Sequence, residues 1–315
     1  MTDLTTRLTG VDFAGPVFTA SGCATAGREL APYFNLSSIG GVVTKSVMLA
    51  PRAGRATRRM AETPSGMLNS IGLQGPGIDA FLATDLPWLA NRGISAVVSI
   101  AGHSAPEYAE LARRLRGAPG LRMIEANISC PNVESRGQVF ACSTDGAAEV
   151  IAAVRAETAA DVPVFAKLSP DVTDLVAIAA SCVAAGADGL SMINTLLGVA
   201  IDTRTLRPVL SAVTGGLSGP AIKPVALRCV WQVHAALPDV PILGMGGIRN
   251  GRDALEFLAA GASAVSVGTV TFSDPAAPAR VQAELAVELS ARGFRSAAEA
   301  VGLAHSHLKE AVRAG

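Results

Sequence analysis

The sequence is poor in aromatic residues, which make up 4% of its 315 residues, and it has no excess of charge of either sign. A formal net charge of +0 argues against nucleic acid or an acidic membrane surface as the main partner. The scarcity of aromatic rings also disfavours the stacking platforms that bind single-stranded nucleic acid. We therefore expect no nucleic-acid partner.

Long apolar runs are missing too, although half of the residues are hydrophobic. A long weakly polar stretch, residues 176–187, is shorter than the ~20 residues that a membrane-spanning helix needs. The N-terminal MTDLTTRLTG lacks the apolar segment of a signal peptide. We expect a cytoplasmic protein that does not interact with membranes.

Cysteines number five, an odd count, and no two form a Cys-x-x-Cys pair. This pattern predicts neither a disulfide framework nor a cysteine-rich metal site. Cys182 and Cys229 lie in helix-like segments and are expected to fill the core. Cys130 differs, because it lies in NISCPN, residues 127–132, where an apolar run ends between two asparagines. It is a candidate for chemistry rather than for packing.

Short β-rich runs alternate with longer helix-like segments along the whole chain. We expect strands at 17–20, 41–45, 96–100, 122–128, 162–168, 189–193, 241–244 and 264–267, with helices at 78–91, 106–116, 145–158, 171–185, 220–236 and 251–260. Several strands are continuous apolar runs, which is typical of parallel strands covered on both faces. The pattern predicts an α/β protein and a (β/α)8 barrel, with residues 1–315 forming one domain.

The alternative fold is an open Rossmann-type sheet, but its glycine fingerprint is missing. Gly244-Met245-Gly246 continues to Arg249 where a third glycine belongs. Residues 7–16 are expected to form a hairpin at the bottom of the barrel. The connections 46–77, 130–144 and 195–219 are long and leave the C-terminal ends of their strands, the face on which barrel active sites are built.

The residues at the eight predicted strand ends include lysines, asparagines, small hydroxyls and glycines, but no histidine, aspartate or glutamate. This set predicts no metal site and no Ser-His-Asp triad. The nearby His103 is expected to be a solvated loop residue, because no carboxylate is evident beside it. Asparagines suit a flat ligand with amide edges, and glycines after the last two strands suit a phosphate. We expect a phosphorylated cofactor and a small anionic substrate.

The chain resembles the class 1 dihydroorotate dehydrogenases, most closely the class 1B catalytic subunit, over nearly its whole length. The resemblance rests on TASG (19–22), TKS (44–46), NSIGLQGPG (69–77), NISCPN (127–132), AKLSP (166–170), MINTLLG (192–198), GGLSGPAIKP (215–224), GMGGI (244–248) and VGT (267–269). It implies a barrel that holds FMN and oxidises dihydroorotate to orotate in pyrimidine biosynthesis.

The resemblance also implies residue roles. Cys130 is expected to be the catalytic base. The substrate-binding residues are expected to be Lys45, Met67, Asn69, Gly72, Leu73, Asn127, Asn132, Asn194 and Thr195. The cofactor-binding residues are expected to be Ala20, Ser21, Gly22, Lys45, Ser46, Ser99, Asn127, Lys167, Ile193, Gly219, Gly246, Gly247, Gly268 and Thr269.

In class 1B, electrons leave through a second subunit that carries FAD and a 2Fe–2S cluster, and they reach NAD⁺. The resemblance therefore implies a homodimer within a heterotetramer. Three alternatives stay open: a fumarate-using class 1A enzyme, a pyrimidine-base oxidoreductase like dihydropyrimidine dehydrogenase, and a barrel that binds a phosphorylated ligand without catalysis.

Overall fold

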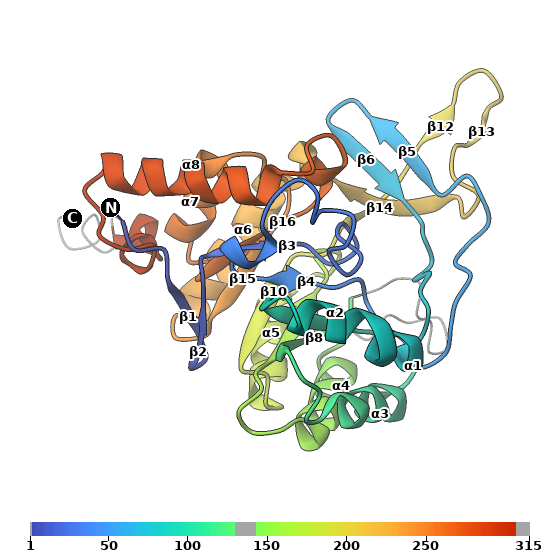
Figure 1. The fold of residues 1–315 in the computed structure, drawn as a ribbon. Helices are drawn as coiled ribbons and strands as arrows, with labels where there is room; N and C mark the ends of the chain where they lie inside the picture. Colours follow the sequence, from blue (N-terminus) through green and yellow to red (C-terminus); the bar gives the residue numbers. More distant parts are fainter. Residues whose placement is uncertain (1, 130–142, 307–315) are drawn as a thin grey trace.

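The computed structural model describes residues 2–129 and 143–306, and its centre is a barrel of parallel strands (Figure 1). Eight strands pair in the order β3-β16-β15-β10-β9-β8-β7-β4. Their bounds are β3 Val17–Thr19, β4 Val42–Val43, β7 Ala96–Ile100, β8 Leu121–Asn127, β9 Val164–Leu168, β10 Gly189–Met192, β15 Ile242–Met245 and β16 Ala264–Val267. Gly40 N donates to Val17 O at 2.8 Å, which joins the two edges of the sheet. The predicted (β/α)8 barrel is confirmed, and each predicted strand overlaps an observed one.

Helices surround the barrel and pack on the outward-facing residues of its strands (Figure 1). The α-helical segments are α1 Ile78–Ala80, α2 Leu86–Ala90, α3 Ala105–Leu115, α4 Thr144–Glu157, α5 Leu175–Ala184, α6 Lys223–Ala236, α7 Gly251–Ala259 and α8 Ala277–Ala291. Short helices of other types are the π-helical η2 Phe81–Asp85 and the 3-10 helices η1 Leu36–Ser38, η4 Pro220–Ile222, η5 Thr269–Phe272, η6 Ala298–Ala300 and η7 Leu303–His305. In the described residues, no helix combines the length and apolar character needed to cross a membrane.

The helix α8 was not among those predicted, the one predicted at 220–236 begins with the 3-10 turn η4, and two more differ further. The segment predicted as one helix at 78–91 contains the π-helical turn η2 between α1 and α2. The helix predicted at 171–185 begins four residues later, because Asp174 caps it: its carboxylate accepts a hydrogen bond from Ala177 N at 2.9 Å. An aspartate at this position satisfies a backbone N–H that has no partner within the helix.

The bottom of the barrel is closed by a hairpin, as the sequence predicts for residues 7–16. Its strands are β1 Thr6–Leu8 and β2 Val11–Phe13. Leu8 and Phe13 pack against an apolar layer inside the barrel that includes Phe18, Met123 and Phe165. Side chains alternate along a strand, so the next inward-facing residue is Glu125 after Met123 on β8 and Lys167 after Phe165 on β9. The interior is therefore apolar at the bottom and polar near the C-terminal face.

Two of the long connections fold together above that face. Residues 46–77 supply β5 Met60–Thr63 and β6 Gly66–Asn69, and residues 195–219 supply β11 Leu196–Val199 and β14 Thr214–Ser218. These strands form an antiparallel sheet in the order β11-β14-β6-β5, and the hairpin of β12 Ile201–Asp202 and β13 Arg207–Pro208 extends outward beside it (Figure 1). The third long connection, 130–144, lies almost entirely outside the described residues.

Candidate active site

A cavity of about 810 Å³ lies at the C-terminal ends of the barrel strands. Residues such as Asn127 and Lys167 enter it from the strands, whereas Asn69 and Gly216 belong to the antiparallel sheet. Asn69 Nδ2 donates to Gly216 O at 3.3 Å, which links β6 to β14 at the cavity wall. A cavity of this size is large enough for a cofactor and a small substrate together.

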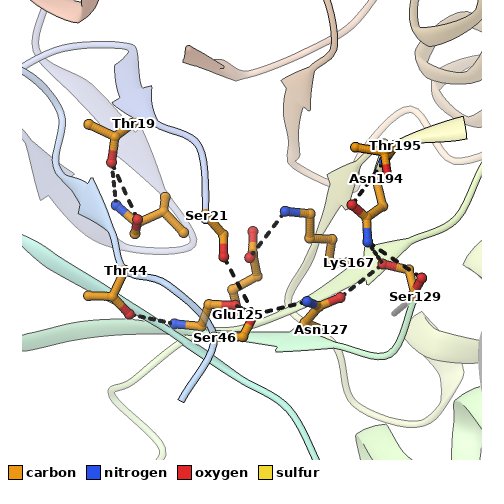
Figure 2. Close-up of polar contacts among 12 residues, drawn as sticks. Thr19, Ser21, Thr44, Ser46, Glu125, Asn127, Ser129, Lys167, Asn194 and Thr195 are labelled. Atoms are coloured by element: carbon orange, nitrogen blue, oxygen red, sulfur yellow. Dashed lines mark hydrogen bonds and ion pairs between the residues drawn. The ribbon is translucent and has the colours of Figure 1, made fainter. Parts of the chain in front are cut away.

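A chain of hydrogen bonds crosses the cavity floor from the first barrel strand to the sixth (Figure 2). Ser46 Oγ lies 3.5 Å from Ser21 Oγ and accepts from Asn127 Nδ2 at 2.9 Å. Ser129 Oγ donates to Asn127 Oδ1 at 3.0 Å and accepts from Asn194 Nδ2 at 2.9 Å. Asn194 Oδ1 in turn accepts from Thr195 N at 2.9 Å. We call these six residues the floor network.

The floor network orients two asparagine side chains before any ligand binds. Asn127 uses one amide N–H and one oxygen lone pair within the protein, whereas Asn194 Nδ2 donates to both Oγ and the carbonyl oxygen of Ser129 and Asn194 Oδ1 accepts once. An amide group carries two N–H donors and two acceptor sites, so Asn127 keeps one of each for a ligand and Asn194 keeps an acceptor site. A fixed donor and acceptor pair of this kind recognises a planar ring with amide or imide edges.

Two lysines bring positive charge to the cavity. Lys45 lines the cavity and is half-buried, and its backbone N donates to Thr25 O at 2.7 Å. Lys167 is 4% exposed, and its Nζ lies 3.6 Å from Glu125 Oε1 (Figure 2). Ammonium groups in a partly desolvated cavity favour a bound anion or an electron-rich ring.

The glycines after β14, β15 and β16 allow close approach of the backbone on one side of the cavity. Gly247 has φ +80°, and a Cβ there would lie 2.9 Å from both Gly219 O and Lys223 Cβ. A side chain is therefore excluded by both backbone conformation and space. Asp253 holds together the segments that flank Gly247, because its carboxylate accepts hydrogen bonds from Arg249 N at 2.8 Å and from Lys223 Nζ at 2.7 Å.

The structure brings nearly all predicted site residues that it describes to this one cavity. Its lining includes the predicted residues Ala20, Ser21, Gly22, Lys45, Ser46, Met67, Asn69, Gly72, Leu73, Asn127, Lys167, Ile193, Asn194, Thr195, Gly219, Gly246, Gly247, Gly268 and Thr269. Ser99 is fully buried, and its Oγ lies 2.9 Å from Ser46 Oγ, so it reaches the cavity through Ser46. Cys130 and Asn132 lie outside the described residues.

Several residues of the site were not among those predicted from the sequence. Ser129 is 2% exposed and joins the two asparagines, although its hydroxyl carries no pattern of its own. Glu125 could have been identified from the sequence, since it is a charged residue inside an apolar strand. The predicted strand ends contain no carboxylate, but one lies just below them inside the barrel, where Glu125 faces Lys167.

Cys23 also lines the cavity and was not predicted to do so. Burial raises the pKa of its thiol to about 11, although the positive charges of Lys167 and Lys45 act in the opposite direction. The thiolate is therefore strongly disfavoured at neutral pH, and this cysteine is not an activated nucleophile.

The expectation that His103 has no carboxylate beside it is wrong. His103 Nδ1 lies 3.0 Å from Glu107 Oε2, and Arg52 Nη1 lies 2.8 Å from His103 Nε2. Glu107 comes one helical turn later, on α3, so the pair forms across the start of that helix. Burial alone would raise the pKa of Glu107, but hydrogen bonds from the backbone N–H and the ring of His103, with the nearby Arg52 charge, lower it. Arg52 lines the cavity, so this group belongs to the rim.

Comparisons with known proteins agree on one family. The family model described as dihydroorotate dehydrogenase matches residues 3–289. The protein of Geobacter sp. (strain M21) named dihydroorotate dehydrogenase B (NAD(+)), catalytic subunit, is 50% identical over 300 residues, which are 95% of this chain and 97% of that protein. A protein of the same name from Anoxybacillus flavithermus is 47% identical over 302 residues, 96% of each chain. The chain therefore belongs to the dihydroorotate dehydrogenase family.

Proposed function

We propose that the chain oxidises dihydroorotate to orotate on bound FMN, and that a partner subunit passes the electrons to NAD⁺. The observation that carries this proposal is the floor network beside the Lys167 ammonium, in a cavity rimmed by phosphate-compatible glycines. Relatives of about 50% identity over 95% of the chain are named as NAD⁺-dependent dihydroorotate dehydrogenase catalytic subunits, which supports the same reaction.

Membership of the family implies a flavin enzyme, and we propose that the flavin is FMN. The donors present fit such a group. Ser266 lines the cavity, and its buried Oγ makes no hydrogen bond to another described residue. An unsatisfied hydroxyl at the cavity wall fits a polar ligand there. The backbone at Gly247 can approach a phosphate because a side chain is excluded there.

The residues proposed to hold FMN form three groups, which contact different parts of the cofactor. Gly219, Gly246, Gly247, Gly268 and Thr269 would hold the phosphate end. Ala20, Ser21, Gly22, Ser46 and Ile193 would contact the sugar chain and the ring, with Ser99 supporting Ser46 from below. Lys167 and Asn127 would contact the polar edge of the ring, where a cation stabilises negative charge on a reduced flavin.

The substrate is proposed to bind between the floor network and the antiparallel sheet. Asn69, Asn127 and Asn194 offer amide donors and acceptors to its ring, together with Thr195 and Asn132. Lys45 would bind the carboxylate of the substrate, and residues 67–73, which include Met67, Gly72 and Leu73, would form one wall. A planar, anionic pyrimidine matches this combination of amides and ammonium groups.

Cys130 is proposed to take the proton from C5 of dihydroorotate as the C5–C6 double bond forms. When bound, FMN supplies the two-electron acceptor for the hydride that leaves C6. A free thiol titrates near pH ~8.5, so a cysteine base favours mildly alkaline conditions unless its surroundings stabilise the thiolate.

The partner is proposed to be a flavoprotein that carries FAD and a 2Fe–2S cluster, bound to a homodimer of this chain. The names of the relatives describe a catalytic subunit, which supports a second subunit in those proteins. Within the described ranges, no cluster of three or more histidine, cysteine, aspartate or glutamate side chains is placed to hold a metal ion.

The direct test is to purify the chain, identify its bound flavin by mass, and add dihydroorotate without oxygen. We expect FMN and a rapid loss of the oxidised flavin absorbance. Dihydrouracil is the matched control, because it has the same reduced ring and lacks the carboxylate proposed to bind Lys45. Reduction by dihydrouracil but not by dihydroorotate would overturn the proposal in favour of a pyrimidine-base oxidoreductase.

A further inference from the structure

Directly beneath the cavity, the barrel encloses a carboxylate and an ammonium group. Glu125 on β8 is fully buried, and Lys167 on β9 is 4% exposed. Glu125 Oε1 lies 3.6 Å from Lys167 Nζ, and the two side chains point toward one another (Figure 2). The proposed function assigns a role to the lysine and none to the glutamate.

The strand register fixes which group lies deeper. Asn127 is the β8 neighbour of Lys167, whereas Glu125 pairs with Phe165, one pleat closer to the barrel bottom. Lys167 lines the cavity, and Phe165 belongs to the apolar bottom layer. The ammonium therefore has the carboxylate behind it and the cavity in front of it.

Burial of Glu125 needs a compensating interaction. Among the described residues, neither of its carboxylate oxygens makes a hydrogen bond, and both are inaccessible. A buried carboxylate without a partner is strongly unfavourable, so the Lys167 charge is what makes this position tolerable. At 3.6 Å the contact is an ion pair without a short hydrogen bond, which leaves the N–H groups of Lys167 for a ligand.

The alternative is that the pair only fills the core. One physical argument and one observation count against this alternative. An apolar pair of similar volume would avoid the desolvation of two charges. The charges also lie at the cavity end of the barrel interior: Lys167 lines the cavity and Glu125 lies directly behind it, whereas the residues towards the barrel bottom are apolar.

We infer that Glu125 is a positioning residue, which holds the Lys167 ammonium at the cavity floor and sets the net charge felt by the bound flavin. This inference rests on the proposed function for its flavin. The negative charge of Glu125 offsets the positive charge of Lys167, so the pair is close to neutral as a whole. The pair still favours negative charge on the ligand, because the ammonium group is nearer to the cavity than the carboxylate. Glu125 thereby limits how strongly the site stabilises a reduced, anionic flavin.

The test compares the FMN-loaded wild type with Glu125→Gln, Lys167→Met and the double variant by redox titration against a reference dye. Glu125→Gln keeps the side-chain size and removes one negative charge. We expect its flavin potential to become more positive, equivalent to a shift of about tenfold or more in the preference for reduced over oxidised FMN. Lys167→Met should shift the potential in the negative direction.

The double variant separates an effect through Lys167 from a general loss of structure. In the Lys167→Met background, Glu125→Gln should restore thermal stability relative to Lys167→Met alone, because no unpaired buried charge remains. If Glu125→Gln alone does not fold while the double variant does, that result also supports the pairing. An unchanged or more negative potential in Glu125→Gln, or stability effects that simply add, would overturn the inference.

The stability measurements use the chain without cofactor, so they do not depend on the identity of the flavin. A wild-type chain that binds no FMN would refute the proposed function. The double-variant cycle would still decide whether Glu125 and Lys167 act as a pair. A wild-type chain that binds FMN, with a potential insensitive to Glu125→Gln, would leave the function intact and remove Glu125 from flavin tuning.

Discussion

Ser129 Oγ lies 2.9 Å from Asn194 Nδ2 and 3.0 Å from Asn127 Oδ1, so one hydroxyl joins two asparagines of different barrel strands. Asn127 ends β8 and Asn194 follows β10, with β9 between them in the sheet. The bridge therefore spans the strand that carries Lys167. It fixes the separation of the two amide groups that are proposed to bind the substrate ring.

Ser129→Ala should weaken orotate binding by about 5- to 100-fold, because the buried Asn127 amide and the half-buried Asn194 amide each lose the hydroxyl partner that orients them. FMN should remain bound, since Ser129 is not among the residues proposed to hold its phosphate. The measurement is orotate titration of the flavin spectrum. Ser37→Ala is the matched control and should bind orotate normally, because the Ser37 hydroxyl likewise donates to an asparagine, Asn35 Oδ1 at 2.9 Å, but does not line the cavity. Loss of flavin from Ser129→Ala with orotate binding retained would contradict the assignment.

Gly247→Ala should lose most of its FMN, because the new Cβ would lie 2.9 Å from Gly219 O at the proposed phosphate site. Its φ of +80° adds backbone strain of roughly 1 kcal/mol for any residue with a side chain. Gly93→Ala is the control, since Gly93 has φ +63° and a Cβ added there would meet nothing within 4 Å. Flavin content after gel filtration should fall in the first variant and stay normal in the second.

Cys130→Ala should retain FMN and lose about 10²- to 10⁴-fold in the rate of flavin reduction by dihydroorotate, the usual cost of removing a general base. Cys130→Ser should be slow at neutral pH and recover partly at high pH, because a hydroxyl is a weaker acid than a thiol. Stopped-flow absorbance without oxygen measures both rates. Near-normal reduction in the alanine variant would exclude Cys130 as the base.

Cys23 should react slowly with iodoacetamide at neutral pH despite its place in the cavity wall. Its pKa is raised by burial from 9.0 to about 11, so at a given pH below 9 the thiolate fraction is about 100-fold lower than for an unperturbed thiol. The rate, followed by peptide mapping of the cofactor-free chain, should rise about tenfold for each pH unit from 7 to 10. A plateau near pH 8 would show that the thiol is not held in its neutral form.

The sequence predicts the barrel well because its signals are local. Continuous apolar strands and helix-like segments alternate, and polar residues follow the strands on the face where the cavity lies. The antiparallel sheet above the barrel has no such signal, since its central pairing joins Gly216 to Asn69, nearly half the chain apart. Glu125 was visible as a charge in an apolar run, but its partner Lys167 is identified only by the folded structure, because Lys167 lies on the neighbouring strand, beyond the residue that pairs with Glu125.

The remaining prediction concerns the electron acceptor. The isolated chain should reduce artificial dyes with dihydroorotate but should not reduce NAD⁺, because the sequence has no dinucleotide fingerprint and its cysteines lack the spacing of cluster ligands. NAD⁺ reduction should appear when a partner flavoprotein carrying FAD and a 2Fe–2S cluster is added. The pure chain is assayed with fumarate, NAD⁺ and a dye side by side, each with and without the partner. Rapid turnover with fumarate would favour a class 1A enzyme, and NAD⁺ turnover by the chain alone would refute the proposed electron route.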